Sequence, residues 1–330
     1  MVSRYSLDLR AERREPVRRA QTKRGRQSSL LRVLLLAIFL YGCNPASPSP
    51  TPVPVTETTQ PTDAPTAAPD HVARIRNAEY QLGLPESLRV VQLTDGKFEE
   101  GTPAGADFTS VIVTDFVARG DLNSDGVDEV VAMVAENYGG TGVFVFLAVF
   151  ADVNGELVFQ TSSLVDDRPA INALSIENAE IFLDAVTHGF EDPFCCPTLK
   201  TSRHFRFTEI GQLTMTDYTT FTPDQRPRTI TIESPVNGTE VFSSVQIKGS
   251  FAIAPFENNL VYRIYDIGGV ELSAGAITVT AADLGASGTF DSIIKLGGLL
   301  SGSTIRIEIQ DISAADGSLF AMDSVELVVK

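Results

Sequence analysis

The chain of 330 residues contains no tryptophan and has only three cysteines and three histidines. The absence of tryptophan excludes the Cys…Trp…Cys signature of antibody-type immunoglobulin domains. The sequence also has no Gly-x-Ser-x-Gly nucleophile elbow and no His-Glu-x-x-His zinc motif, which removes two common hydrolase signatures. An enzymatic site would therefore have to use carboxylates or one of the few histidines.

Basic residues are also in short supply. The chain has 26 Lys and Arg against 42 Asp and Glu, a formal net charge of −16. A surface of this sign repels nucleic acid and anionic lipid head groups, so we do not expect nucleic acid among the partners. The same surface attracts cations, including calcium, although acidity by itself also keeps a protein soluble.

The basic residues that exist are concentrated at the N-terminus. Residues 1–42 hold ten of them, and this segment includes a short apolar run, Val33–Leu40. The run is far below the roughly 20 residues that span a bilayer. Leu40-Tyr41-Gly42-Cys43 ends it, and a Pro/Ser/Thr-rich stretch follows. This order resembles a bacterial lipoprotein signal, with Tyr41 bulkier than the pattern prefers.

The resemblance implies that residues 1–42 are a cleaved signal peptide and that Cys43 is lipidated. The protein would then be a membrane-anchored lipoprotein on the extracytoplasmic side, at the cell surface or in the periplasm. An uncleaved anchor and a plain secretory signal are the alternatives. Residues 43–70 are rich in proline, which removes backbone donors and favours an extended polyproline II spacer, so we expect them to act as a tether.

Residues 71–222 have the pattern of a mostly antiparallel β domain. We expect this region to open with a helix over Asp70–Leu84. Apolar runs rich in β-branched and aromatic residues then predict strands over Val130–Val134 and Val143–Phe150, buried on both faces. The tetrapeptide Asp152-Val153-Asn154-Gly155 predicts a hairpin after the second strand. Further strands are expected near 171–176, 181–186, 204–207 and 213–215.

A proline-bearing linker, residues 223–227, leads to a second region over residues 228–330. Apolar and polar residues alternate there with the period of a strand, most clearly from Ile305 to Ile309. About seven strands in roughly 100 residues, with Asn-Gly and Gly-Gly turns between them, are typical of an immunoglobulin-like β-sandwich. The predicted fold class is therefore mainly β, a β-rich N-terminal domain followed by an immunoglobulin-like sandwich.

Several segments of this second region point to a known family. Ser234-Pro235-Val236-Asn237-Gly238-Thr239-Glu240-Val241 and then Val245-Gln246-Ile247-Lys248-Gly249 resemble the opening of the immunoglobulin-like domain of bacterial spore-germination proteins. Gly288-Thr289-Phe290 and the closing strand Val325–Val329 also fit, whereas Phe256–Leu260 matches only in part. The resemblance covers residues 228–330 and implies an accessory or binding domain of a cell-envelope protein. It carries over no catalytic residue.

The sharpest motif in the chain is Asp121-Leu122-Asn123-Ser124-Asp125-Gly126-Val127-Asp128-Glu129. Its oxygen-bearing groups have the spacing of a calcium loop, but position 12 is Ala132 and a strand follows where an EF-hand has a helix. The loop is instead similar to those of FG-GAP-type β-repeat proteins. One structural calcium ion is predicted, with a polar β-turn as the alternative. The predicted ligands are Asp121, Asn123, Asp125, Val127 through its carbonyl, and Glu129.

With Cys43 lipidated, the only other cysteines are the adjacent pair Cys195 and Cys196. In an oxidising compartment a disulfide between them is the first interpretation, and free structural thiols are the second. A zinc site formed with His188 and His204, or a nucleophilic cysteine assisted by one of these histidines, are the remaining interpretations.

Taken together, these features predict a lipid-anchored cell-envelope protein that acts as a non-enzymatic binding or structural module. Its expected partner, besides the membrane, is a cell-wall polymer or another envelope protein. The competing hypothesis is an envelope hydrolase with its site in residues 71–222. A pocket that holds His188, Glu191 or Asp192 together with Asp184 would favour the enzyme. A two-lobed solute-binding protein is disfavoured because the chain lacks strand–helix alternation.

Overall fold

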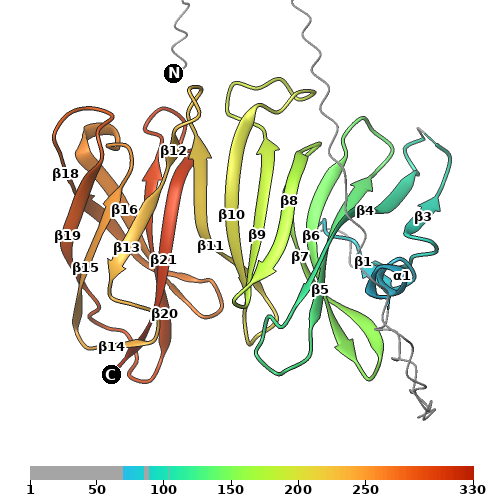
Figure 1. Ribbon diagram of the computed structural model, residues 1–330, viewed down its shortest axis with the longest axis horizontal. Coiled ribbons are helices and arrows are strands. Elements are labelled where there is room, and N and C mark those ends of the chain that lie inside the picture. The colour runs from blue at the N-terminus through green and yellow to red at the C-terminus, as the bar shows by residue number, and fades with distance from the viewer. Residues whose placement is uncertain (1–69, 85–88, 104) are drawn as a thin grey trace, which may run out of the picture. The chain divides into compact units, whose positions relative to one another are not determined.

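The computed structural model describes residues 70–84, 89–103 and 105–330. Cys43, the expected signal peptide and nearly all of the expected tether lie outside these residues. The described part is almost entirely β, as predicted, with one short α-helix (Figure 1). None of its helices is long and apolar enough to cross a membrane.

The helical elements are α1 (His71–Ile75) and a single 3-10 turn, η1 (Phe256–Asn258). The strands before the linker are β1 (Glu79–Gln81), β2 (Val90–Gln92), β3 (Lys97–Glu100), β4 (Thr109–Gly120), β5 (Glu129–Asn137), β6 (Phe144–Val153), β7 (Glu156–Asp167), β8 (Ala170–Glu177), β9 (Glu180–Thr187), β10 (Leu199–Phe207) and β11 (Leu213–Phe221). The later strands are β12 (Pro227–Arg228), β13 (Ile230–Ser234), β14 (Thr239–Val241), β15 (Ser244–Phe251), β16 (Asn259–Asp266), β17 (Glu271–Thr278), β18 (Thr280–Ala281), β19 (Gly288–Lys295), β20 (Thr304–Ile312) and β21 (Leu319–Val329).

The expected helix over Asp70–Leu84 is wrong beyond its first turn. Helix α1 starts after Asp70, whose carboxylate accepts hydrogen bonds from the backbone N–H groups of Val72 and Ala73, both at 3.2 Å. This is the usual N-cap arrangement. The helix lasts five residues, and the chain then turns into β1, where Tyr80 is fully buried. Pairing of β1 with β2 and burial of the Tyr80 ring therefore override the helical pattern.

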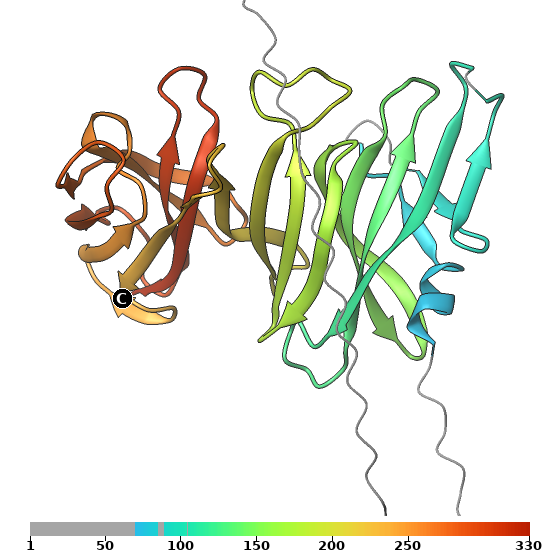
Figure 2. The same cartoon turned by 45° about the horizontal axis from the view of Figure 1, so that its top comes forward.

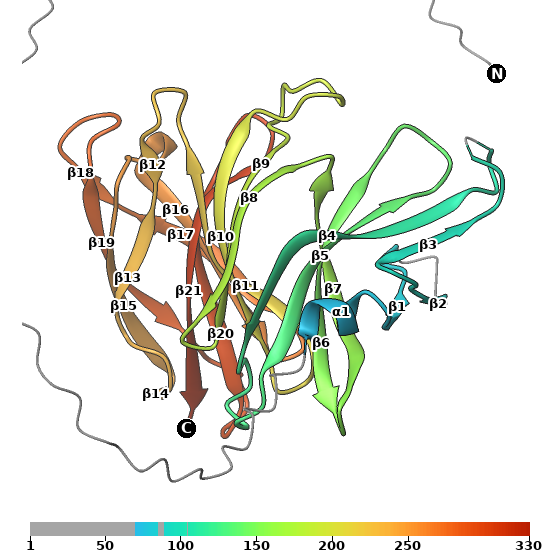
Figure 3. The ribbon, with the colours of Figure 1, turned by 45° about the vertical axis from the view of Figure 1, so that its right-hand side comes forward.

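Strands β3 to β7 form an antiparallel five-stranded sheet that is covered on both faces. On β5, Val130 and Val134 face a core completed by α1, β1 and β2, whereas Val131 and Met133 face a second core formed with β9 and β10. Figure 3 shows α1 and β8–β10 on opposite sides of β5 and β6. The prediction that these strands are buried on both faces is confirmed.

The predicted hairpin between β6 and β7 is also confirmed. The two strands pair as far as Val153 opposite Glu156, which leaves a two-residue turn. Asn154 and Gly155 in that turn both have positive φ angles, 56° and 90°. A two-residue hairpin of this kind needs that conformation, and Asn-Gly supplies it at low steric cost.

The C-terminal region is the expected two-sheet sandwich. Strands β13, β15, β19 and β18 form one sheet, and β17, β16, β20 and β21 belong to the other. Side chains from both sheets meet in one apolar core, which includes Ile247, Leu260, Ile264, Ile307 and Leu327. On β15, buried and more exposed residues alternate, as a half-buried strand requires.

One ten-stranded sheet contains strands from both regions of the sequence (Figure 2). The link is the antiparallel pairing of β11 with β21, which involves only Asp217–Thr219 and Ala321–Asp323. Beyond these three pairs, residues 213–215 of β11 pair with β10, and residues 324–328 of β21 pair with β20. The two strands thus diverge, and we call the space between their diverging ends the wedge.

Candidate functional site

The predicted calcium loop is the turn between β4 and β5. Asp121 accepts hydrogen bonds from the backbone N–H groups of Asp125, at 3.2 Å, and Gly126, at 3.0 Å. Asn123 Oδ1 accepts one from Asp125 at 2.9 Å, and Asp125 Oδ1 accepts one from Val127 at 2.8 Å. The side chains at positions 1, 3 and 5 therefore turn into the loop, where they organise its backbone.

Glu129 closes the loop and is only 2% exposed. Its two carboxylate oxygens accept hydrogen bonds from Leu122 N–H at 2.8 Å and from Asn123 Nδ2 at 3.0 Å. Burial raises its pKa, and the nearby Asp125 and Asp121 charges act in the same direction against the Leu122 hydrogen bond. Within the described ranges, no group of three or more His, Cys, Asp or Glu is placed to hold a metal ion. The five-residue ligand set stays a prediction.

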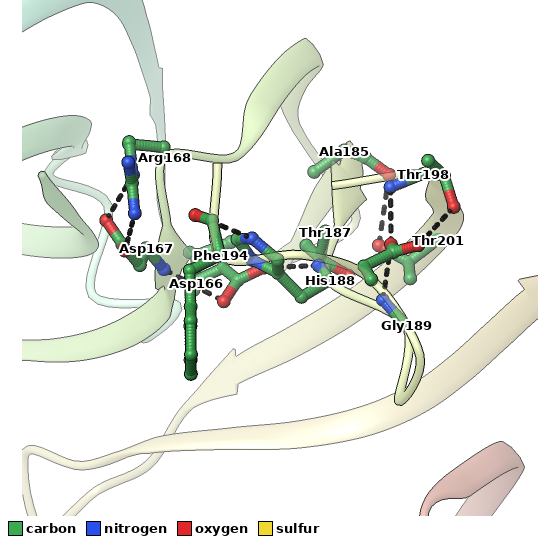
Figure 4. Close-up of polar contacts among 12 residues, drawn as sticks. Asp166, Asp167, Arg168, Ala185, Thr187, His188, Gly189, Phe194, Thr198 and Thr201 are labelled. Carbon is green, nitrogen blue, oxygen red and sulfur yellow. Dashed lines mark hydrogen bonds and ion pairs between the residues drawn. The ribbon is translucent and has the colours of Figure 1, made fainter. Parts of the chain in front are cut away.

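The loop between β9 and β10, residues 188–198, contains the adjacent Cys195 and Cys196, and we call it the tip loop (Figure 4). His188 is fixed at its base: Nδ1 lies 2.9 Å from Asp166 Oδ2, and Nε2 lies 3.2 Å from the Phe194 carbonyl oxygen. The backbone N–H of His188 also donates to Asp166 at 2.5 Å. Partial burial disfavours the charged ring, but Asp166 outweighs it, so that the pKa of His188 is raised above its usual value.

Asp192 organises the rest of the tip loop. Its carboxylate accepts hydrogen bonds from the backbone N–H groups of Gly189, at 2.8 Å, and Thr198, at 2.7 Å, and from the Thr198 hydroxyl at 2.8 Å. These donors favour the carboxylate form and lower the pKa of Asp192. The two ends of the loop are thereby tied to one side chain.

The sulfur atoms of Cys195 and Cys196 are bonded to each other in the structure. His188 lies in the same loop, but His204 is part of β10, where its ring packs at a tilt against Phe182 with centroids 4.3 Å apart. The four residues considered for zinc are not placed to hold a metal in the described part of the chain.

Two phenylalanines of the tip loop face solvent. Phe190 is 78% exposed and Phe194 is 87% exposed. In Figure 4 the Phe194 ring points away from His188 and Asp166, although its carbonyl binds the histidine. The sequence pointed to the cysteines, the histidine and the carboxylates Glu191 and Asp192 of this loop, but not to these aromatic side chains. Their exposure depends on how Asp192 folds the loop, which the sequence does not show.

The wedge contains two adjoining cavities. The larger, of about 560 Å³, has Leu122, Asn123 and Ser124 of the calcium-type loop in its wall. The smaller, of about 170 Å³, lies where β11 and β21 begin to diverge. Neither cavity is lined by the residues that would have favoured a hydrolase, which are His188, Glu191, Asp192 and Asp184.

Two facing carboxylates dominate the smaller cavity. Asp217 of β11 lies directly opposite Asp323 of β21 in the strand register. Burial raises the pKa of Asp217 to about 7, with further contributions from the charges of Asp323 and Glu180. Burial likewise raises the pKa of Asp323 to about 6, although it accepts hydrogen bonds from Ile232 N–H at 2.6 Å and Ser324 N–H at 2.7 Å. Neither aspartate belongs to a recognisable sequence motif.

Comparison with known proteins identifies one part of the chain. A search of curated proteins finds no significant match. Residues 229–318, less than a third of the chain, match the family described as the immunoglobulin-like domain of bacterial spore germination. The match begins one residue before β13 and ends one residue before β21, which confirms the resemblance of the C-terminal region over residues 229–318.

Proposed function

We propose that this protein is a non-enzymatic binding module of the bacterial cell envelope, and that the tip loop is its contact with a protein partner. The observation that supports this most directly is the exposure of Phe190 and Phe194, at 78% and 87%, on a loop whose base is tied by hydrogen bonds. Aromatic side chains are the usual anchors of protein interfaces.

The hydrogen bonds of the loop favour this role because they reduce the entropy lost on binding. Asp192 holds both ends of the loop, and His188 holds Phe194 through its carbonyl. A disulfide between Cys195 and Cys196 would restrict the backbone next to Phe194 further. A recognition loop that is already ordered binds more tightly than one that must be ordered by its partner.

The charge of the molecule narrows the class of partner. The chain carries a net charge of −16, and Glu191 and Asp192 lie between the two exposed phenylalanines. Negative charge around an apolar contact disfavours anionic wall polymers and anionic lipid surfaces. An apolar groove on another envelope protein fits the loop better than either of these.

Anchoring would place this contact at the membrane. We propose, from the residues around Cys43 alone, that the chain is lipidated there and that residues 43–70 space the folded part from the bilayer. The immunoglobulin-like family of residues 229–318 agrees with a position outside the cytoplasm.

We also propose one structural calcium ion in the β4–β5 turn. Asp121, Asn123, Asp125, the Val127 carbonyl and Glu129 would hold it, and all of their donor atoms are oxygens, as calcium prefers. The support is the buried Glu129 carboxylate, whose pKa is raised by burial and by two neighbouring aspartates. A bound cation would compensate these charges and stabilise the turn.

The hydrolase alternative is less well supported. Both ring nitrogens of His188 face acceptors inside the protein, so the ring is not free to take a proton from a substrate. The proposal of a binding module therefore has the stronger geometric basis.

A binding experiment with matched variants tests the protein contact. Full-length protein in mild detergent is incubated with membrane proteins and, separately, with purified cell-wall sacculi from cells that produce it. The Phe190→Ser/Phe194→Ser double variant should lose at least tenfold in affinity for one membrane protein, whereas Leu284→Ser, at an equally exposed apolar site, should not. Binding to sacculi alone, or equal binding by both variants, would overturn the proposal.

A further inference from the structure

The smaller cavity of the wedge has more acidic than basic side chains in its wall. Four carboxylates line it against one guanidinium, that of Arg206. The guanidinium is already engaged, since it lies 2.6 Å from Glu326 and 3.9 Å from Glu180. The carboxylates of Asp217 and Asp323 have no cation of their own among the residues that line the cavity. The acidic residues of the wall are Glu180, Asp217, Asp323 and Glu326.

A second observation in the same cavity is independent of these charges. Thr216 is about nine-tenths buried, and its hydroxyl oxygen has no hydrogen-bond partner. The residue lies at a β-bulge, where His204 pairs with Asp217 but Phe205 pairs with Met215. The bulge explains how Thr216 and Asp217, although adjacent, both line the cavity. A buried hydroxyl without a partner is costly, and its place in the wall indicates a polar occupant.

We propose that the wedge binds a primary ammonium group, with the ammonium in the smaller cavity between Asp217 and Asp323 and the body of the ligand in the larger cavity. An ammonium carries the positive charge that the wall lacks, and it has three hydrogen-bond donors. Asp217, Asp323 and the Thr216 hydroxyl supply three acceptors. The inference does not depend on the function proposed for the tip loop.

The arrangement favours an ammonium group over a metal ion. A metal ion needs several ligand atoms within about 2.0 to 2.6 Å of one point, whereas the two facing aspartates stand on separate strands, β11 and β21. Carboxylates on separate strands can instead each accept a hydrogen bond at ordinary distance. His204, also in the wall, has its pKa lowered by burial and so does not add a competing charge.

The larger cavity indicates the shape of the rest of the ligand. It has a volume of about 560 Å³ and shares Glu180, Arg206, Asn237 and Glu326 with the smaller one, so the two adjoin. Its wall combines apolar side chains, such as Ile267 and Ile305, with amides and hydroxyls. A short alkyl chain that ends in an ammonium group suits this succession, as in a lysine side chain of a peptide or in a free diamine.

Calorimetric titration of the full-length protein tests the inference. The probes are Nα-acetyl-lysine amide, its Nε-acetylated derivative, which lacks the ammonium group, and 1,5-diaminopentane. We expect saturable binding of the first probe and none of the second. Tight binding of the diamine with weak binding of the lysine probe would assign the site to free amines, and the reverse would assign it to peptides.

Three variants determine where the probe binds. Asp217→Asn and Thr216→Val should each weaken binding of the amine at least tenfold. Asp184→Asn, which makes the same change of charge on β9 outside both cavities, should leave it unchanged. Thr216→Val should not lower the midpoint of thermal unfolding, because it removes a hydroxyl that has no partner. Equal binding by all three variants, no binding of either amine, or saturable binding of calcium or magnesium at Asp217 instead would overturn the inference.

Discussion

The tip loop and the wedge use polar and apolar groups in opposite ways. In the tip loop, the carboxylates of Asp192 and Asp166 are engaged by the loop itself, and two phenylalanines face solvent. In the wedge, carboxylates and the hydroxyl of Thr216 are buried, and that hydroxyl has no partner. The tip loop presents apolar side chains, and its polar groups are hydrogen-bonded within the loop. The wedge presents buried polar groups, one of which lacks such a partner.

This difference indicates which kind of ligand each site can take. Exposed aromatic rings gain most by entering an apolar groove, because that removes apolar surface from water. Buried carboxylates gain most from a cation, because charge in a low-dielectric site is costly until it is compensated. The two sites therefore call for different tests, and perturbation of one should leave the other intact.

The largest effect on the free energy of unfolding is expected from the pH dependence of Asp217 in the wedge. Asp217 has a pKa of about 7 in the folded protein against 3.8 for an ordinary aspartate, so its contribution to stability is fully present below pH 3.8 and is lost as pH rises through 7. One pKa unit corresponds to about 1.4 kcal/mol. We expect Asp217→Asn to be more stable than the wild type by about 2–4 kcal/mol at pH 8, and the two to converge near pH 4.

Denaturant unfolding of both proteins between pH 4 and 8 measures this difference. The groups that face Asp217 are Asp323, Glu180 and His204, and each is present in both proteins. Asp184→Asn, which makes the same change of charge on β9 outside both cavities, serves as the control. A constant difference for Asp217→Asn would show that the wedge carboxylates are not strained by burial.

The second-largest effect on stability is expected from calcium binding at the β4–β5 turn. Like the wedge, this turn would then hold carboxylates whose charge a bound cation compensates. A ligand that binds only the folded state at 100 times its dissociation constant stabilises it by about 2.7 kcal/mol. Calcium should therefore raise the midpoint of thermal unfolding, and Asp125→Ala should abolish the rise. Asp128→Ala is the control, because Asp128 pairs with Arg119 at 2.5 Å and is not a predicted ligand. A rise that persists in Asp125→Ala would exclude this loop.

A smaller and local effect is expected from His188 in the tip loop. Its pKa is raised above 6.5 mainly through Asp166, so its stabilisation is fully present below pH 6.5 and is lost as pH rises through the raised pKa. The amides of Gly189 and Thr198 should then show faster hydrogen exchange, after correction for intrinsic pH effects. In Asp166→Asn this extra pH dependence should disappear. Unchanged protection across the transition would mean that His188 does not order the loop.

The smallest effect on global stability is expected from reduction of Cys195 and Cys196. Adjacent cysteines close no long segment of chain, so their bond removes little entropy from the unfolded state. The unfolding midpoint of the Cys195→Ser/Cys196→Ser variant should shift by less than the equivalent of about 1 kcal/mol. Binding through Phe194 should nevertheless weaken, because the neighbouring backbone becomes freer. A large loss of stability would show that the pair supports more than the tip loop.

Much of the fold could be predicted because it depends on local patterns. Alternation predicted the C-terminal sandwich, and Asn154-Gly155 predicted the hairpin between β6 and β7 in the N-terminal region. The helix over Asp70–Leu84 failed because burial of Tyr80 against another strand outweighs local preference. The wedge could not be predicted at all, since Asp217 and Asp323 are brought together only by the pairing of β11 with β21, two strands far apart in the sequence.

The candidate sites also differ in whether a local sequence pattern reveals them. The Asp121 loop and the two cysteines are contiguous, so they could be found by inspection. The exposure of Phe190 and Phe194 could not, because it depends on hydrogen bonds from Gly189 and Thr198 to Asp192. The most visible motif and the best-supported contact surface are therefore different parts of the molecule.

The most direct test of the binding-module proposal is photo-crosslinking in cells that produce the protein. A photoreactive phenylalanine analogue replaces Phe194 in one variant and Leu284, which is 82% exposed, in the other. The proposal predicts one discrete crosslinked protein from position 194 and none from position 284. The absence of a product from position 194, or the same product from both positions, would contradict it.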